Sequence, residues 1–232
     1  MSSDLKASKF QILDATALKI IAVVSMTIDH TGYVLFPHTM WLRCIGRLAF
    51  PLYAFLIVQG FLHTHDVRKY LARLGLLAVV SEIPFNLMVS GRIFYRYAQN
   101  VFFTLFLGLL TIAAMDWMIR RVPDKRYVLF WCVIPAAAGC LVAHLVASDY
   151  SYCGILMIAL FYVASGNFWY QLVSVGFIQF WMGGLQIWAV SSFIPLAMYN
   201  GRKGCSNRIV QWLFYFYYPL HILVLYFLRI LL

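Results

Sequence analysis

The run LKIIAVVSMTIDHTGYVLF, residues 18–36, decides how this chain can fold. It is close to the length of a membrane-spanning helix, which needs about 20 mostly apolar residues. Within it, however, Asp29 and His30 stand side by side. A charge at the centre of a membrane helix costs roughly 2.5–3.5 kcal/mol, so such residues usually face the interior of a helix bundle and serve a function. The run therefore predicts a membrane helix and a polar site inside the protein.

The whole chain has the composition of an integral membrane protein. Of its 232 residues, 63% are hydrophobic and 11% are charged, whereas a soluble domain is about a quarter charged. We expect an all-α, polytopic membrane helix bundle of about nine transmembrane helices, forming a single domain over residues 1–232. The predicted spans are 18–37, 44–62, 69–89, 100–118, 127–147, 152–165, 168–181, 185–199 and 211–231.

The formal net charge of +10 indicates how the chain is oriented rather than binding to nucleic acid, because the basic residues fall in loops. They cluster before the first predicted span and after the second, fourth and eighth, so that nine spans would place all four clusters on one side. The positive-inside rule then puts the N-terminus in the cytoplasm and the C-terminus outside. Arg92 and Arg96 lie on the opposite side and weaken this reading without reversing it.

Ionisable residues of three predicted spans reach nearly the same depth. At about 1.5 Å per residue, Asp29 and His30 lie roughly 16 Å up the first span, Glu82 roughly 18 Å up the third, and His221 about 15 Å up the ninth. They predict a polar layer close to the membrane midplane. Because adjacent helical residues point about 100° apart, Asp29 is badly placed to orient His30. We expect His30 to pair with Glu82 or His221 instead.

The packing around this layer leaves two interpretations open. Ala22, Ser25, Asp29 and Gly32 share one face of the first span, and small residues there predict close contact with another helix. Polar groups also hold membrane helices together, so a purely structural role is the alternative to a functional one. Three further polar residues are expected nearer the outer face, namely Arg47, Asn100 and Asp149.

The aromatic run WLFYFYYPLH, residues 212–221, is denser than a membrane-interface belt requires. Tyr217 and Tyr218 lie on the side of the last span that carries His221, so they either line a cavity or face lipid.

The five cysteines show no paired spacing, and the sequence HTHD at residues 63–66 is a weak metal-binding signal. We therefore expect no metal site and no disulfide framework.

Six segments, taken together and in this order, resemble the TraX family over nearly the whole chain. They are LKIIAVVSMTIDHTGYVLF (18–36), GRLAFPLYAFLIVQG (46–60), SEIPFN (81–86), QNVFFTLFLGLL (99–110), DYSYCGIL (149–156) and FYFYYPLHILVLY (214–226). TraX proteins are bacterial inner-membrane acetyltransferases, and the type member acetylates the N-terminal amine of F-type conjugative pilin from acetyl-CoA. The residues of this chain that match family positions are Asp29, His30, Arg47, Asn100 and His221. Glu82 belongs to the SEIPFN version of the family, which implies a chromosomal relative with its own acceptor.

The resemblance implies roles for the polar layer. His30 would act as general base or as a covalent acyl carrier, oriented by Glu82 or His221, with Asp29 stabilising the imidazolium or the helix geometry. Arg47 and Asn100 would bind the acceptor or polarise the carbonyl, and Asp149, Tyr217 and Tyr218 would add to acceptor binding. The phosphates of acetyl-CoA would meet basic residues of the inner loops, namely Arg68, Lys69, Arg73, Arg120 and Arg121. Topology and anionic lipid explain the same basic residues equally well.

Two other classes of function fit the same residues. Acids and histidines at the midplane are also typical of a proton-coupled transporter, although the chain shows no clear internal repeat. A non-catalytic membrane partner that handles pilin is the second alternative. The acceptor therefore stays open between a pilin amine, a glycan hydroxyl and another envelope amine.

Overall fold

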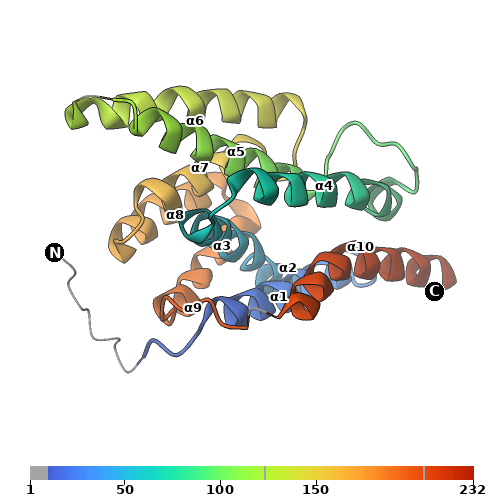
Figure 1. Cartoon of the computed structure of the whole chain (residues 1–232). Helices are drawn as coiled ribbons and strands as arrows, with labels where there is room; N and C mark the ends of the chain where they lie inside the picture. Colours follow the sequence, from blue (N-terminus) through green and yellow to red (C-terminus); the bar gives the residue numbers. More distant parts are fainter. Residues whose placement is uncertain (1–9, 123, 206) are drawn as a thin grey trace.

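The computed structural model describes residues 10–122, 124–205 and 207–232, and this part of the chain consists of helices and connecting loops, with two isolated bridges and no strand (Figure 1). The α-helices are α1 (Ala15–Val34), α2 (Met40–Gly46), α3 (Ala49–His63), α4 (Val67–Ser90), α5 (Val101–Ile119), α6 (Val128–Leu145), α7 (Ser151–Val163), α8 (Phe168–Met182), α9 (Phe193–Ala197) and α10 (Arg208–Leu231). Two 3₁₀ helices, η1 (Lys125–Tyr127) and η2 (Gly184–Ser192), precede α6 and α9.

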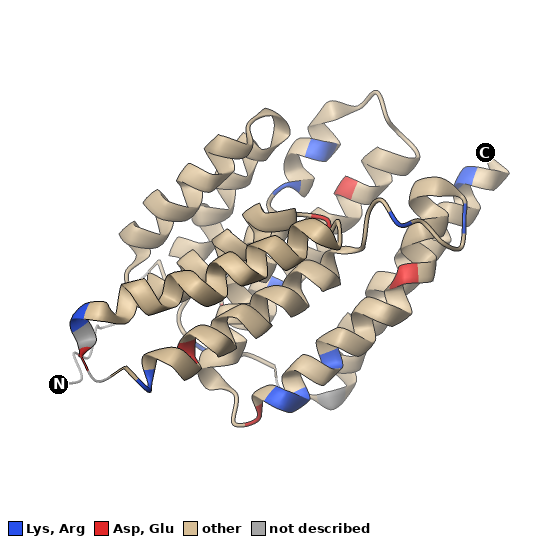
Figure 2. Ribbon diagram, turned by 90° about the horizontal axis from the view of Figure 1, so that it is seen from above, with Lys and Arg blue, Asp and Glu red and all other residues tan. Residues whose placement is uncertain are grey.

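The helices indicate a multi-pass membrane protein. Within the described residues, five segments are long and apolar enough to cross a bilayer: Met40–His63, Val67–Ser90, Val101–Ile119, Val128–Leu145 and Ile209–Leu231. Helix α1 has 20 residues, but Lys19, Asp29 and His30 lower its mean hydropathy. Figure 2 shows most charged residues near helix ends or in loops, with long uncharged stretches between them. All nine predicted spans coincide with helical segments, whereas nine crossings and a cytoplasmic N-terminus stay predictions.

Helix α3 forms the centre of the bundle. It packs against α1, α5 and α7, and most of its residues are buried. Helix α5 lies between α4, α6 and α7, and α10 lies against α4 and α1 (Figure 1). Side chains such as Leu52, Leu105, Ile158 and Phe161 fill the shared core and are almost completely buried. This arrangement brings the ends of α1, α4 and α10 and the start of α5 to the same end of the bundle, called here the pocket end.

The second predicted span, 44–62, falls within Met40–His63, which is long and apolar enough to cross a bilayer, but it is not one regular helix. The chain forms α2 and α3 instead, with a turn at Arg47 and Leu48 between them. Pro51 explains the break, because proline has no N–H to donate to the carbonyl four residues earlier and its ring crowds that carbonyl. The carbonyl in question belongs to Arg47. The turn lets α2 pack closely on α1, where a side chain on Gly32 would lie 2.7 Å from Cβ of Leu42.

Candidate functional site

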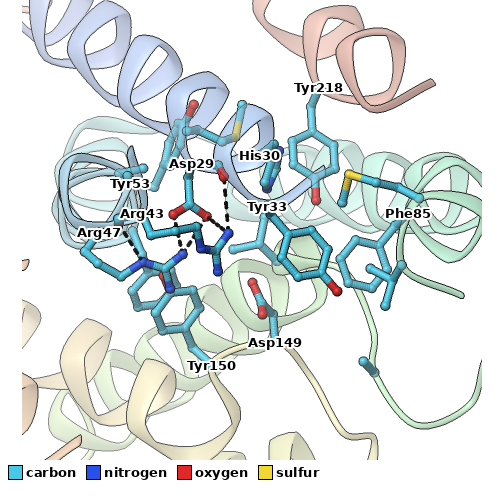
Figure 3. Close-up of a pocket in the computed structure, with 18 residues that line it drawn as sticks. Asp29, His30, Tyr33, Arg43, Arg47, Tyr53, Phe85, Asp149, Tyr150 and Tyr218 are labelled. Carbon is cyan, nitrogen blue, oxygen red and sulfur yellow. Dashed lines mark hydrogen bonds and ion pairs between the residues drawn. The ribbon is translucent and has the colours of Figure 1, made fainter. Parts of the chain in front are cut away.

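A polar pocket of about 260 Å³ opens at the pocket end of the bundle. Its walls come from α1, α2, α3, α4, the start of α5, α10 and the loop between α6 and α7 (Figure 3). The ionisable or aromatic residues that line it are Asp29, His30, Tyr33, Arg43, Arg47, Phe50, Tyr53, Phe85, Asp149, Tyr150 and Tyr218. Segments that are far apart in the sequence thus meet around one cavity, as the polar layer predicts.

His30 pairs with His221, one of its two expected partners. Nδ1 of His30 lies 2.8 Å from Nε2 of His221, and the two rings are nearly parallel with centroids 5.1 Å apart. Nδ1 of His221 lies 2.9 Å from the backbone carbonyl of Tyr217. A carbonyl only accepts, so this nitrogen carries the hydrogen. When both rings are neutral, Nε2 of His221 accepts from His30, and Nε2 of His30, a residue that lines the pocket, keeps a lone pair with no hydrogen-bond partner within the described residues.

Asp29 binds two arginines and does not contact its neighbour His30, as the helical geometry predicts. Its carboxylate accepts from Nη1 of Arg43 at 2.9 Å and from Nη2 of Arg47 with both oxygens. The side chain of Asp29 is buried, together with Ala22, Ser25 and Gly32 on the same face of α1, which confirms the expected packing. Gly46 makes the contact with Asp29 possible, because a Cβ there would lie 2.1 Å from Cβ of Asp29.

Arg43 is a charged pocket residue that the sequence analysis does not single out, and the same holds for the lining tyrosines Tyr33, Tyr53 and Tyr150. Arg43 also donates to the backbone carbonyl of Asp29 at 3.2 Å, and its guanidinium lies 5.0 Å from the ring centre of Tyr33. Only Nη1 has a hydrogen-bond partner within the described residues, so Nε and Nη2 remain available at the pocket wall. The signal that could have revealed it is its spacing of four from Arg47, which puts both arginines on one face of a helix.

Glu82 and Asn100 form a separate pair outside the pocket lining. The Asn100 amide donates to Oε2 of Glu82 at 2.6 Å and to the carbonyl of Ala78 at 2.8 Å. Its oxygen accepts from the N–H of Phe102 and thereby caps the start of α5. The expectation that Glu82 joins His30 is wrong, because depth along a helix does not determine direction around its axis. The polar site is also nearer the end of α1 than the midplane, because Asp29 lies only five residues before Val34.

Asp149 and Tyr150 enter the pocket from the loop between α6 and α7, and Figure 3 shows Asp149 reaching toward it from the side opposite α1. The backbone N–H of Gln99 donates to the carbonyl of Ala147 at 2.9 Å and so anchors this loop. The ring of Tyr150 stacks on Phe50 with centroids 3.6 Å apart. Asp149 is exposed at the pocket. Desolvation by the nearby protein raises the pKa of its carboxyl to about 6, and nearby Arg47 limits the rise.

The two tyrosines of the aromatic run have different positions. Tyr218 is buried, lines the pocket, and meets His30 edge-on with ring centroids 6.1 Å apart. Tyr217 does not line the pocket. Its hydroxyl lies 2.7 Å from the hydroxyl of Thr27, and its ring stacks on His221. Tyr217 therefore packs against His221 of the histidine pair without lining the pocket itself.

The basic residues expected to bind CoA lie at the opposite end of the bundle. Lys69 pairs with Asp66 and Arg120 with Asp116, while Arg73 and Arg121 lie over aromatic rings. Arg68 is close to the start of α4, far from the pocket residues near its end. From Arg120 to Val101, α5 rises roughly 28 Å. These residues and the pocket cannot contact the same small group at once.

The described residues contain no cluster of three His, Cys, Asp or Glu side chains that could hold a metal ion. None of the five cysteines in these residues forms a disulfide bond. The pocket chemistry thus rests on one imidazole, two arginines, two carboxyls and several tyrosines.

Comparison with known proteins agrees with the resemblance of the motifs. The chain is 28% identical, over 97% of both sequences, to a protein of Dichelobacter nodosus described as probable fimbrial assembly protein FimC, serogroup H1. It is 31% identical to the uncharacterized protein RP591 of Rickettsia prowazekii (strain Madrid E), over 39% of this chain and 33% of that one. No solved structure gives a significant match. The family model described as TraX protein matches residues 14–229, and the chain therefore belongs to the TraX family.

Proposed function

We propose that this protein is a membrane acetyltransferase that moves an acetyl group from acetyl-CoA to an amine of the bacterial cell envelope, such as the N-terminus of a pilin. Membership of the TraX family and similarity to a probable fimbrial assembly protein support an acceptor related to pili. The localisation that goes with this function is the bacterial inner membrane. Both the reaction and the acceptor are parts of this proposal.

The observation that carries the proposal is the free Nε2 of His30 at the pocket wall. The contacts His30 Nδ1 to His221 Nε2 and His221 Nδ1 to the Tyr217 carbonyl assign this lone pair to His30. A neutral imidazole with a free nitrogen is the usual general base of proteins at physiological pH. His221 is then a positioning residue, because it acts on the reaction only through His30.

The transfer step uses the pocket residues in the following way. The acceptor nitrogen attacks the thioester carbonyl carbon, its proton passes to Nε2 of His30, and the carbon–sulfur bond breaks. The proton then passes to the departing CoA thiolate. Negative charge develops on the carbonyl oxygen, and the unused N–H groups of Arg43 are donors suited to it. Asp29 holds Arg43 and Arg47 in place, while Asp149, Tyr218 and the other aromatic walls would bind the acceptor.

The distance between the pocket and the basic opposite end bears on the route of the acetyl group. Arg68, Lys69, Arg73, Arg120 and Arg121 are candidates for the CoA phosphates, yet α5 places Arg120 roughly 28 Å from the pocket. A covalent acetyl-His30 would allow donor and acceptor to react in separate steps, since the same free nitrogen is a nucleophile. Direct transfer instead requires the thioester end of CoA to reach His30 through the bundle.

A proton-coupled transporter is supported less well. Such a protein needs a chain of groups that each take up and release a proton. Behind His30 the chain has one further member, His221, whose second nitrogen donates to the backbone carbonyl of Tyr217. A backbone carbonyl does not pass a proton onward, so this path ends there. A non-catalytic pilin partner would not need the free nitrogen at all.

Purified wild-type protein and a His30→Ala variant, incubated with acetyl-CoA and a peptide that has a free N-terminal amine, would test the proposal. Release of the CoA thiol and a 42-dalton mass gain, about the mass of an acetyl group, would be measured on the same samples. Loss of general base catalysis is worth about 10²–10⁴-fold in rate. We expect His30→Ala to fold, insert in the membrane and lose transfer by at least this factor.

The matched control is His144→Ala. His144 is an exposed histidine of α6 that does not line the pocket, so this variant should keep the wild-type rate. Wild-type transfer by His30→Ala would rule out the assigned base. Radiolabelled acetyl-CoA supplied without acceptor distinguishes the two routes, because only the covalent route leaves label on the protein.

A further inference from the structure

The loop between α4 and α5, residues 91–99, carries an unusual surface next to the pocket. Its side chains Phe94, Tyr97 and Ile93 are 87%, 66% and 55% exposed. Arg92 and Arg96 alternate with them and are exposed as well. Exposed apolar rings interleaved with arginines are typical of a protein surface at the boundary between acyl chains and headgroups.

The arginines at this place have no acidic partner within the described residues. The guanidinium of Arg92 has no hydrogen bond or ion pair there. That of Arg96 contacts the hydroxyl and the ring of its neighbour Tyr97, at 3.2 Å and 5.1 Å. Arg229, near the end of α10, donates to the carbonyl of Met88 at 3.4 Å and to nothing else. Three arginines of the pocket end therefore lack an acidic partner within the described residues, on the side where the positive-inside rule expects few basic residues.

The loop is held in a defined position. Gly91 ends α4 in the left-handed conformation with φ 69°, which glycine adopts without strain. The Asn86 amide donates to the carbonyl of Ile93 at 3.0 Å, and the N–H of Gln99 donates to the carbonyl of Ala147 at 2.9 Å. These bonds fix the start and the end of the loop. The exposed rings and arginines are thus a preformed surface.

We propose that residues 92–97, with Arg229, bind the headgroups of anionic phospholipids in the membrane leaflet at the pocket end. The guanidinium groups of Arg92, Arg96 and Arg229 would contact lipid phosphates, and Phe94 would lie at the boundary of the acyl chains. A lipid surface fits better than an acidic protein, because the loop lies where α4 and α10 end and α5 begins, at the level of the interface. The neighbouring residues Val89 and Ala98 line the pocket, so the bound lipid sits beside its mouth.

Photo-crosslinking tests this site independently of acetyl transfer. Benzoylphenylalanine would replace Phe94 in full-length protein, in nanodiscs that hold equal amounts of phosphatidylglycerol and phosphatidylcholine. Each basic residue near an anionic surface favours binding by about five-fold. We expect phosphatidylglycerol adducts at residue 94 to exceed phosphatidylcholine adducts by about five-fold or more, and the double variant Arg92→Gln/Arg96→Gln to reduce this excess.

The matched control places the same crosslinker at Phe177, an exposed residue of α8 without neighbouring basic groups in sequence. It should form lipid adducts in proportion to the lipid mixture. Equal proportions at residues 94 and 177 would overturn the proposal. So would crosslinks from residue 94 to protein alone, because the loop would then lie away from the headgroups. The result does not depend on whether the protein transfers acetyl groups.

Discussion

At the residue scale, the function depends on which nitrogen of His30 carries the hydrogen. His221 determines this by accepting from Nδ1 of His30 while its own Nδ1 donates to the Tyr217 carbonyl. A His221→Leu variant should keep its pocket, since His221 does not line it, but His30 would no longer be held in one tautomer. We expect the rate of acetyl transfer to fall about 10²-fold or more with little change in KM.

A His221→Gln variant separates positioning from packing. Its amide oxygen can accept from His30 and should restore part of the rate that His221→Leu loses. The pH–rate profile is the second measurement. Removing His221 should shift the part of the profile that depends on the protonation of His30. Equal rates for wild type and His221→Leu would show that His30 needs no partner.

Asp149 leads to a prediction about pH. Desolvation by the nearby protein raises the pKa of its carboxyl from 3.8 to about 6, so the folded protein binds a proton more tightly than the unfolded chain. The stabilisation that this proton provides is fully present below pH 3.8 and is lost as pH rises through 6. The Asp149→Asn variant has an uncharged side chain at every pH, with nearly the shape of a protonated aspartate. Its melting temperature in detergent, relative to wild type, should therefore rise between pH 4 and pH 7.

Asp124→Asn is the control for this effect. Hydrogen bonds from Arg126 lower the pKa of the Asp124 carboxyl, which is the opposite direction. The stabilisation from Asp124 is present above its usual pKa and lost in acid, so its variant should become relatively less stable as pH rises. The same sign of change in both variants would contradict the environment assigned to Asp149.

The pocket residues also show how far residue-level prediction reaches. Asp29, His30, Arg47, Asp149 and Tyr218 were predicted as site residues, and all of them line the pocket. Glu82 and Asn100 were expected there too, but they pair with each other, because depth along a helix gives no information on direction across the bundle. Arg43 was missed for a related reason. A loop arginine before a predicted span becomes a pocket residue only because α2 folds back on α1.

At the element scale, the approach of α2 to α1 depends on a glycine. A Cβ on Gly46 would lie 2.1 Å from Cβ and 2.2 Å from an oxygen of Asp29. A Gly46→Ala variant must therefore displace Asp29 or separate the helices, and forcing extra atoms into a packed site costs about 1–3 kcal/mol. We expect a lower midpoint of denaturant unfolding together with a loss of transfer activity.

Gly176→Ala is the matched control, since it lies within α8 and a Cβ there meets nothing within 4 Å. Alanine favours a helix over glycine by about 1 kcal/mol. This variant should be as stable as wild type or slightly more stable. If Gly46→Ala behaved in the same way, the contact between α2 and Asp29 would not be as close as described.

The helices themselves were predicted well, and the reason is physical. Long apolar runs bounded by charged or glycine-rich segments indicate helices whatever their neighbours are, so even the short predicted spans 152–165 and 168–181 match α7 and α8 closely. The break between α2 and α3 was missed because the chain is continuously apolar from Leu48 to Val58. Pro51 was its only local signal. Proline is tolerated inside other helices of this chain, such as Pro84 in α4 and Pro219 in α10.

At the scale of the whole molecule, the remaining question is how many segments cross the membrane. Five segments of the described residues are long and apolar enough to do so alone. The shorter α7, α8 and η2–α9 follow one another between α6 and α10. Nine crossings require each of the three to cross, and the termini then lie on opposite sides. The side of the membrane on which each of two loops lies therefore tests the number of crossings.

Residue 96, in the loop after α4, and Cys205, in the loop before α10, are separated by five segments: α5, α6, α7, α8 and η2–α9. If all five cross, the two positions lie on opposite sides, with Cys205 in the cytoplasm by the positive-inside rule. We expect an impermeant maleimide, applied to cells with a permeabilised outer membrane, to label Arg96→Cys but not Cys205, each as the only cysteine of the chain. Inverted membrane vesicles should give the reverse. Both positions are exposed, so access to the reagent does not decide the result. Labelling of both from one side would mean that an odd number of these five segments fails to cross, and the short segments α7, α8 and η2–α9 would be the first candidates.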